Sequence, residues 1–242
     1  AVPGAVHAFT TRHGGVSPAP FDSLNFADNR GDRSENLLEN YRLLGEAVGI
    51  DASRAVGCRQ IHSDLVRVAC EEDAGKILWN DRPYDADGLI TNVPNLPLFA
   101  YGSDCCVITL YDPTSRSIGA VHAGWRGTAA GIALKAAVSM MSCYGADPYT
   151  LRAAIGPSIG KCCFETDRDV ADAFFALLDP AMDERIEQRG DKFHIDLKEI
   201  NRLWLLRAGI DPSRIDVHPD CTKCLPERYW SHRAMGEKRG GM

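Results

Sequence analysis

The residues best suited to do chemistry lie between Ser103 and Ala130, in the sequence SDCCVITLYDPTSRSIGAVHAGWRGTAA. Cys105 follows Asp104 near the start, and His122 lies near the end, shortly before the glycine-flanked Arg126. A thiolate and an imidazole held close together can share a metal ion or act as a nucleophile and its base. This stretch therefore predicts a reactive site, and the surrounding elements must position it.

A β-hairpin is predicted to bring these two groups together. Residues 107–111 and 118–121 are rich in β-branched and aromatic side chains, which is typical of strands, and residues 112–115 form a turn signal. If the turn centres on Pro113 and Thr114, Cys105 lies directly opposite His122. Opposed residues in an antiparallel pair have Cβ atoms roughly 5 Å apart.

A glycine-rich turn follows the hairpin and leads into a predicted helix over residues 129–141. Free backbone N–H groups at a helix N-terminus favour anions, here near Thr128. Arg126 adds a planar group suited to a carboxylate or a phosphate. An ordinary turn with a surface arginine is the alternative, and the neighbouring His122 and Cys105 favour a site.

Composition and charge limit the classes of protein to which the chain can belong. The 242 residues are 45% hydrophobic and 25% charged, which suits a globular domain, and no leader peptide or membrane span is expected. The formal net charge is -6 without a basic run, so a nucleic-acid polymer is not an expected partner. Nine cysteines, four of them in adjacent pairs, predict reduced thiols in the cytoplasm rather than a disulfide framework. Nothing in the sequence specifies an oligomeric state.

Periodicity predicts the remaining elements. A capping box at Asp32 and Glu35 should begin a helix whose apolar stripe ends at Gly49. Further helices are expected over residues 170–178 and 197–208, and further strands over residues 6–12, 65–69, 89–91, 96–101, 151–155, 193–196 and 215–218.

Four other features need an interpretation. His62, alone in its segment, would usually be a structural histidine, and Asp87, in a turn, can orient a histidine or an arginine. The segment 156–160 matches G-x-S-x-G, but no helix signal follows it, so Ser158 is not predicted to be a nucleophile. The C-x-x-C at residues 221–224 lacks a second ligand pair at zinc-finger spacing and does not predict a zinc ribbon.

Several segments together resemble the laccase-domain family, also called the multicopper polyphenol oxidase family, whose members are mostly named purine nucleoside phosphorylases. The resemblance covers nearly the whole chain, and the AVHAGWRG block is highly specific. The matching segments are FTTRHGGVS (9–17), RQIHS (59–63), DADGLIT (85–91), SDC with AVHAGWRG (103–127), AIGPSIGKCCFE (154–165) and CTKC with YWSHR (221–233).

The resemblance implies a fold, a metal and a function. We expect a single compact α+β domain over residues 1–242, with a mixed sheet flanked by helices in layers. The family's metal ligands fall on His62, Cys105 and His122, although Cys106 stands where many members have an apolar residue. Zinc is the expected ion, with copper possible. The implied activity is phosphorolysis of adenosine, inosine, guanosine and methylthioadenosine, with adenosine deamination alongside.

Three protein ligands leave a fourth zinc position for water or substrate, which is typical of catalytic zinc. Zinc lowers the pKa of water from about 15.7 to about 7, which would provide a hydroxide for attack on a purine carbon. For phosphorolysis, Arg59, Arg126 and Thr128 are candidates to hold phosphate, with Arg233 a weaker one. Glu165 or Asp104 can handle a proton or a ribose hydroxyl.

Three alternatives stay open at this point. A copper-dependent polyphenol oxidase would use the same His₂Cys set, but seven histidines are few for a multicopper enzyme. A hydrolase that edits peptidoglycan precursors would use Cys105 as nucleophile and His122 as base. A zinc-stabilised binding module would recognise a nucleoside or a partner without turnover.

Overall fold

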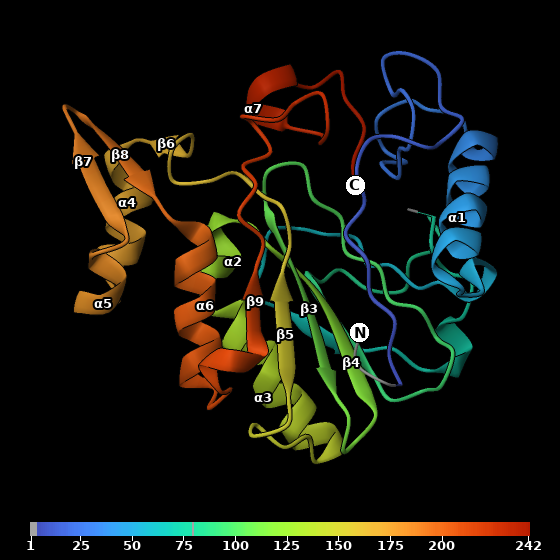
Figure 1. The fold of residues 1–242 in the computed structure, drawn as a ribbon, viewed down its shortest axis with the longest axis horizontal. Helices are drawn as coiled ribbons and strands as arrows, with labels where there is room; N and C mark the ends of the chain where they lie inside the picture. Colours follow the sequence, from blue (N-terminus) through green and yellow to red (C-terminus); the bar gives the residue numbers. More distant parts are fainter. Residues whose placement is uncertain (1–3, 79) are drawn as a thin grey trace.

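In a computed structural model, which describes residues 4–78 and 80–242, the chain is built around two β-sheets (Figure 1). The larger is mixed and has the strand order β1-β2-β4-β3-β5-β9; the smaller has the order β6-β8-β7. The strands of the larger sheet are β1 (Val66–Val68), β2 (Gly88–Thr91), β3 (Cys106–Asp112), β4 (Ser117–Ala123), β5 (Arg152–Ile155) and β9 (Ile215–Val217). Those of the smaller sheet are β6 (Glu165–Thr166), β7 (Ile186–Arg189) and β8 (Lys192–Ile195). The predicted α+β class with a mixed sheet is confirmed.

Some helices cover one face of the larger sheet, and others lie beyond its ends. Helices α3 and α6 lie together against the sheet, whereas α1 and the smaller sheet lie at opposite ends of the molecule (Figure 1). No helix in the described part of the chain is both long and apolar enough to span a bilayer. The helices are α1 (Ser34–Val48), α2 (Trp125–Ala129), α3 (Ile132–Tyr144), α4 (Arg168–Phe175), α5 (Pro180–Asp183), α6 (Leu197–Arg207) and α7 (His232–Met235).

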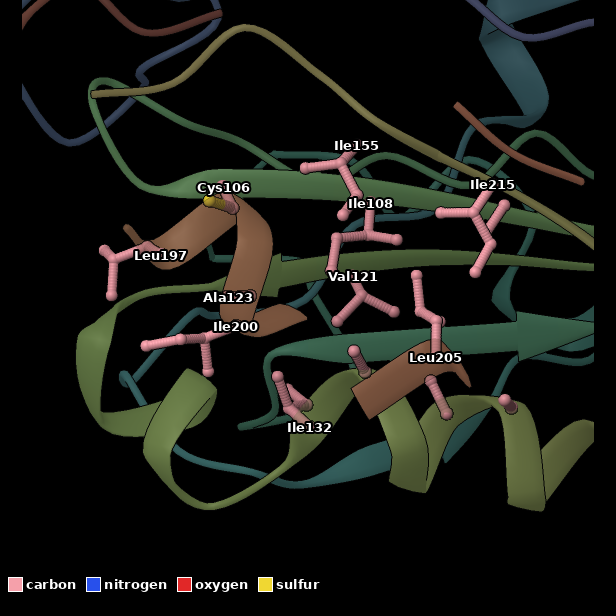
Figure 2. Close-up of a cluster of buried hydrophobic side chains, with 14 of the residues drawn as sticks. Cys106, Ile108, Val121, Ala123, Ile132, Ile155, Leu197, Ile200, Leu205 and Ile215 are labelled. Carbon is pink, nitrogen blue, oxygen red and sulfur yellow. The ribbon is translucent and has the colours of Figure 1, made fainter. Parts of the chain in front are cut away.

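The main hydrophobic core lies between the larger sheet and helices α3 and α6, and it extends to α4, α5 and the smaller sheet (Figure 2). Along β3, Cys106, Ile108 and Leu110 are buried, and the residues between them are half-buried. This alternation follows from the two-residue period of a strand, which sends successive side chains to opposite faces. On the other face, the hydroxyl of Thr109 lies 3.5 Å from Nδ1 of His7, so the N-terminal segment packs there.

The predicted register of the hairpin is wrong by two residues. His122 pairs with Val107 rather than with Cys105, and the last pair before the turn joins Asp112 to Ser117. Four residues therefore form the loop instead of a tight turn at Pro113-Thr114, and Arg116 adopts a left-handed conformation with φ 54°. The sequence predicts where a turn lies more reliably than it predicts how many residues the turn contains.

The helix predicted over residues 129–141 is two helices. Helix α2 begins at Trp125 and α3 at Ile132, with Gly131 between them at φ 76°. Glycine adopts this left-handed conformation without steric cost. The Nε1 of Trp204 donates to the carbonyl of Thr128 at 2.8 Å. This backbone carbonyl therefore has a hydrogen-bond partner where the two helices are separated.

Three other predicted elements differ from the structure. Residues 6–12 form no strand, because this segment crosses the sheet face instead of pairing at an edge. Residues 96–101 form only an isolated bridge between Leu98 and Val56, since Pro97 has no N–H to donate to a ladder. The N-cap of α1 is Arg33, so Asp32 and Glu35 form no capping box; the Asp32 carboxylate accepts from Asn36 and Arg33 instead.

One end of the larger sheet collects the residues that the sequence singled out. Cys105 directly precedes β3, Asp87 directly precedes β2, and His122 lies next to the last residue of β4. Because β4 is antiparallel to both β2 and β3, these three positions meet at the same end of the sheet.

Candidate metal and catalytic site

Three side chains from three separate segments converge at this end of the sheet. The ligand atoms of His62, Cys105 and His122 all lie within 4.8 Å of one another, and the two imidazole centroids are 4.8 Å apart. His62 is exposed, Cys105 is half-buried and His122 is buried. A soft thiolate with two imidazoles suits zinc or copper. The structure thus brings together the three ligands that the resemblance implies.

His62 reaches this site from a turn, not from a strand. Arg59 and Asp85 form an isolated bridge, after which the chain leaves the sheet and His62 takes φ 58°. A non-glycine residue at positive φ is uncommon and needs surrounding contacts to hold it. His62 therefore lies in no strand of the described chain.

Asp87 supplies those contacts. Its fully buried carboxylate accepts from the backbone N–H of His62 at 3.0 Å and of Ser63 at 2.6 Å, and from that of Ile61 at 3.3 Å. It also accepts from the Ser63 hydroxyl at 2.7 Å and lies 2.8 Å from Nδ1 of His122. An Nδ1–H donated to a carboxylate leaves Nε2 as the free lone pair for a metal. Asp87 therefore orients a histidine, one of the two roles expected for it.

The pKa values of these groups follow from the same contacts. Burial alone would raise the pKa of Asp87, but hydrogen bonds from His122 and Ser63 hold it below its usual value. Burial alone would lower the pKa of His122, but the adjacent Cys105 and the Asp87 carboxylate raise it to about 9. Burial, together with the charges of His122 and Arg126, lowers the pKa of His62. A lowered pKa favours the neutral imidazole, the form that binds a metal.

Cys105 and Cys106 have different surroundings. Cys106 faces the core, where its sulfur lies 3.3 Å from the Ser158 hydroxyl and burial raises the pKa of its thiol to about 12. Cys105 instead lies beside the two histidines. Ser158 is itself buried, and turns rather than a helix follow its loop, in agreement with the prediction that it is not a nucleophile.

Two glycines lie close to the site. A Cβ at Gly124 would lie 3.4 Å from the Cys105 sulfur and 3.7 Å from Nε2 of His122, so this backbone is within contact distance of the ligand atoms. A Cβ at Gly127 would lie 2.7 Å from the Ser63 carbonyl oxygen, so a side chain would push α2 away from the His62 turn. Gly127 thus allows α2 to pack closely against the turn that carries His62.

Arg126 is a cation close to His62. Its guanidinium stacks on Trp125, 4.2 Å from the ring centroid, and its charge lowers the pKa of His62. Among residues 4–78 and 80–242, no carboxylate forms an ion pair with it. Arg126 can therefore meet an anionic ligand without breaking an existing pair.

Two other candidates for phosphate binding are engaged elsewhere. Arg59 binds the Asp85 carboxylate at 2.5 Å and the carbonyl of Arg82. Thr128 is fully buried, and its hydroxyl accepts from Asn201 at 2.9 Å. Because α2 begins at Trp125, Thr128 is not at a helix N-terminus, and the structure gives it a packing role.

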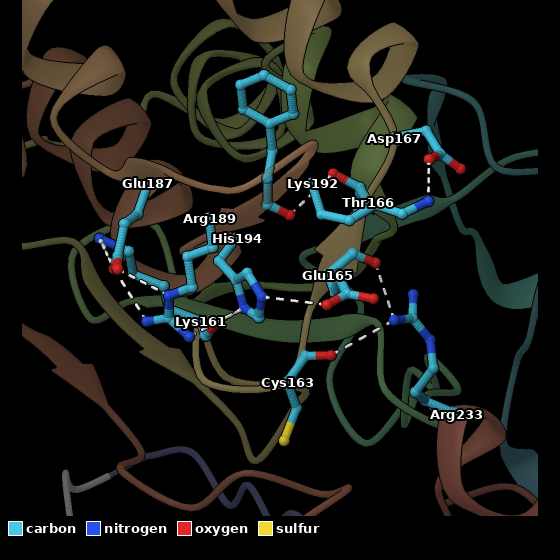
Figure 3. A network of polar contacts seen from close by, with 11 residues as sticks. Lys161, Cys163, Glu165, Thr166, Asp167, Glu187, Arg189, Lys192, His194 and Arg233 are labelled. Atoms are coloured by element: carbon cyan, nitrogen blue, oxygen red, sulfur yellow. Dashed lines mark hydrogen bonds and ion pairs between the residues drawn. The ribbon is translucent and has the colours of Figure 1, made fainter.

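The acidic candidates and Arg233 also have partners. Both carboxylate oxygens of Asp104 are engaged, one by the Thr222 hydroxyl and one by the Arg233 N–H, each at 2.6 Å. Asp104 therefore holds the backbone before Cys105. Glu165 belongs to a polar network on the smaller sheet, where its carboxylate lies 3.5 Å from Nε2 of His194 and its carbonyl accepts from Arg233 at 2.9 Å (Figure 3).

Replacing Asp87 with asparagine tests its control of the metal ligands. The amide has the same shape, but it carries no charge and cannot accept all the hydrogen bonds of the carboxylate. We expect zinc affinity to fall about 10- to 100-fold, as is common for partners of metal-bound histidines. Competition with a chromogenic chelator measures this, and Asp85→Asn, at an exposed carboxylate two residues away, is the matched control. Equal effects of the two substitutions would contradict the role of Asp87.

The raised pKa of His122 predicts a pH dependence for the metal-free protein. A histidine whose pKa is about 9 when folded and 6.5 when unfolded stabilises the fold fully below pH 6.5, and loses this contribution as pH rises through 9. We expect the free energy of unfolding to fall by roughly 1–3 kcal/mol across this window. Urea titrations at pH 6 and pH 9.5 measure the difference. His122→Gln should remove it and the exposed His7→Gln should not; a slope that survives in His122→Gln would assign it to another group.

Comparisons with known proteins show the family of the chain. The family model described as multi-copper polyphenol oxidoreductase laccase matches residues 6–242. A Geobacillus stearothermophilus protein named purine nucleoside phosphorylase YlmD is 36% identical over 95% of this chain and 85% of its own length. A protein of an unknown prokaryotic organism named adenosine deaminase RL5 is 34% identical over 97% of this chain and 91% of its own. The crystal structure of Bacillus licheniformis YfiH superposes with a TM-score of 0.91 at 32% identity, covering 96% of this chain and 88% of that one. The chain therefore belongs to the multi-copper polyphenol oxidoreductase laccase family.

Proposed function

We propose that this chain is a zinc-dependent purine nucleoside phosphorylase that also deaminates adenosine. The observation that carries the proposal is the convergence of His62, Cys105 and His122, with the charge of Arg126 close to His62. The names of the relatives support the reaction class. The proposed substrates are adenosine, inosine, guanosine and methylthioadenosine, with inorganic phosphate.

The metal would be held by one sulfur and two imidazole nitrogens. When bound, zinc supplies a Lewis acid that polarises an oxygen or lowers the pKa of a water molecule. Asp87 fixes the tautomer of His122 and the turn that carries His62, so the metal-binding atoms are in position before a metal or a substrate binds.

Phosphorolysis requires an anchored phosphate. A phosphate oxygen forms a bond to C1′ of the ribose as the bond from C1′ to the purine nitrogen breaks, and the leaving purine takes up a proton. Arg126 is proposed to bind the phosphate, because its fork of N–H donors suits a bidentate contact and Trp125 supports its guanidinium plane. Arg59 is a second candidate, at the cost of its pair with Asp85.

A metal-free Cys–His hydrolase is the second candidate, and one contact favours it. His122 contacts Asp87 on one side and Cys105 on the other. In a hydrolase, Asp87 would orient His122, His122 would act as the base and Cys105 as the nucleophile. Such an enzyme would act on an amide, for example in a cell-wall precursor, and would keep its activity after chelation. The phosphorylase would lose its activity under the same treatment.

Product analysis by mass spectrometry tests the proposed function. Zinc-loaded protein is incubated with adenosine with and without phosphate. We expect adenine and ribose 1-phosphate only with phosphate, and inosine in both buffers. His62→Ala should abolish both reactions. His7→Ala is the control, because His7 is an exposed histidine near the N-terminus. Unchanged adenosine, with zinc confirmed on the protein, would refute the proposal.

Arg126→Ala separates the two activities. The loss of a charged hydrogen-bonding partner costs about 1.5–3 kcal/mol, which corresponds to a rise of about tenfold or more in the KM for phosphate. Deamination uses no phosphate and should keep its rate. Arg168→Ala, at an exposed arginine paired with Asp172, is the matched control. An unchanged KM for phosphate, or an equal loss of deamination, would remove Arg126 from the phosphate site.

A further inference from the structure

A second group of metal-ligating side chains lies outside the site described above. Cys162 and Cys163 follow β5 and its glycine-rich loop, and Cys221 and Cys224 form the C-x-x-C that follows β9. Because β5 and β9 pair in parallel, both segments leave the sheet at the same end. A bridge between Ser158 and Cys221 then keeps the two segments together.

The distances among the four sulfurs match those of a metal site. All four lie within 4.8 Å of one another, and Cys224 Sγ is 3.8 Å from Cys162 Sγ and 3.5 Å from Cys163 Sγ. Tetrahedral zinc with bonds of about 2.3 Å places its sulfurs about 3.8 Å apart. A disulfide would need about 2.05 Å. The four thiols thus have nearly the spacing that a tetrathiolate requires.

We propose that Cys162, Cys163, Cys221 and Cys224 form a closed tetrathiolate site for one zinc ion. Four protein ligands leave no position for water or substrate, so this ion would be structural. The C-x-x-C has its second ligand pair after all, in the adjacent cysteines of the other segment. The proposal does not rest on the proposed phosphorylase activity, and the site differs from the three-ligand centre in both ligand number and purpose.

The surroundings of the sulfurs are suited to thiolates. The backbone N–H of Gly160 donates to Cys221 Sγ at 3.2 Å, a contact that stabilises negative charge on sulfur. Four thiolates around Zn²⁺ carry a net charge of -2, and Lys161 and Lys223 lie next to the ligands in the sequence. The Arg233 guanidinium adds positive charge at the Cys162–Cys163 turn, donating to the Cys163 carbonyl at 3.4 Å (Figure 3).

This zinc would also steady the first site. Thr222, between the two cysteines of the C-x-x-C, donates to the Asp104 carboxylate at 2.6 Å, and the N–H of Ile159 donates to the Asp104 carbonyl at 2.8 Å. Asp104 directly precedes Cys105 and is held at φ 96°. Zinc that ties the two loops together would therefore fix the backbone that presents Cys105.

Metal counting on the purified, reduced protein tests the proposal. After loading with zinc and removal of excess, we expect about two zinc ions per chain. The double variant Cys162→Ser/Cys224→Ser should bind about one, and so should His62→Ala/His122→Ala. Cys143→Ser, at an exposed cysteine of α3 outside both groups, should still bind about two.

X-ray absorption identifies the ligands even if the double cysteine variant does not fold. Zinc in His62→Ala/His122→Ala should show only sulfur neighbours, at about 2.3 Å. One zinc ion in the wild-type protein, with none in His62→Ala/His122→Ala, would overturn the proposal. Nitrogen or oxygen neighbours in that variant would overturn it as well. A disulfide within this group that survives treatment with a reducing agent, in place of zinc binding, would also exclude it.

Discussion

The buried carboxylate of Asp87 is the constraint on which the candidate active site depends. It provides an acceptor for successive backbone N–H groups in the His62 turn and for the Nδ1 of His122. Without this carboxylate, partly buried backbone N–H groups of the turn would have no hydrogen-bond partner in the protein, at a cost of about 1–3 kcal/mol each. A single side chain thus sets both the backbone conformation of one ligand and the tautomer of another. Its position directly before β2, beside β4, makes this double role possible.

Much of the fold could be predicted because it follows from local pattern. Runs of β-branched and aromatic residues marked β3 and β4, and Gly49 marked the end of α1. The errors came where a single backbone conformation decides the outcome. Arg116 at positive φ lengthens the hairpin loop and shifts its register, and Gly131 breaks a stretch that is helical by composition. Residues other than glycine seldom adopt such conformations, so the sequence gives little warning at Arg116, whereas Gly131 is a residue that permits the break.

The three candidate metal ligands were singled out by motifs, and the structure brings them together, but the roles of their neighbours could not be predicted. Thr128 and Asp104 both lie within or beside the motifs, and the structure uses their side chains for packing and backbone support. Burial decides which polar residues can meet a ligand, and burial depends on partners far away in the sequence. Asn201, which donates to Thr128, belongs to α6, and Thr222, which donates to Asp104, lies in the C-terminal segment.

Ligand number and histidine supply favour zinc as the proposed ion in this member of a family named for copper. Electron transfer through several coppers requires a large set of histidines, and the chain has seven, of which two join the Cys105 site. Breaking a glycosidic bond with phosphate changes no oxidation state, so a metal without redox chemistry is sufficient. With zinc bound, the proposed His₂Cys set would leave a fourth position for a substrate, whereas the four cysteines would surround their ion completely. The two proposed sites would thus differ in purpose, one supporting chemistry and the other holding two loops together.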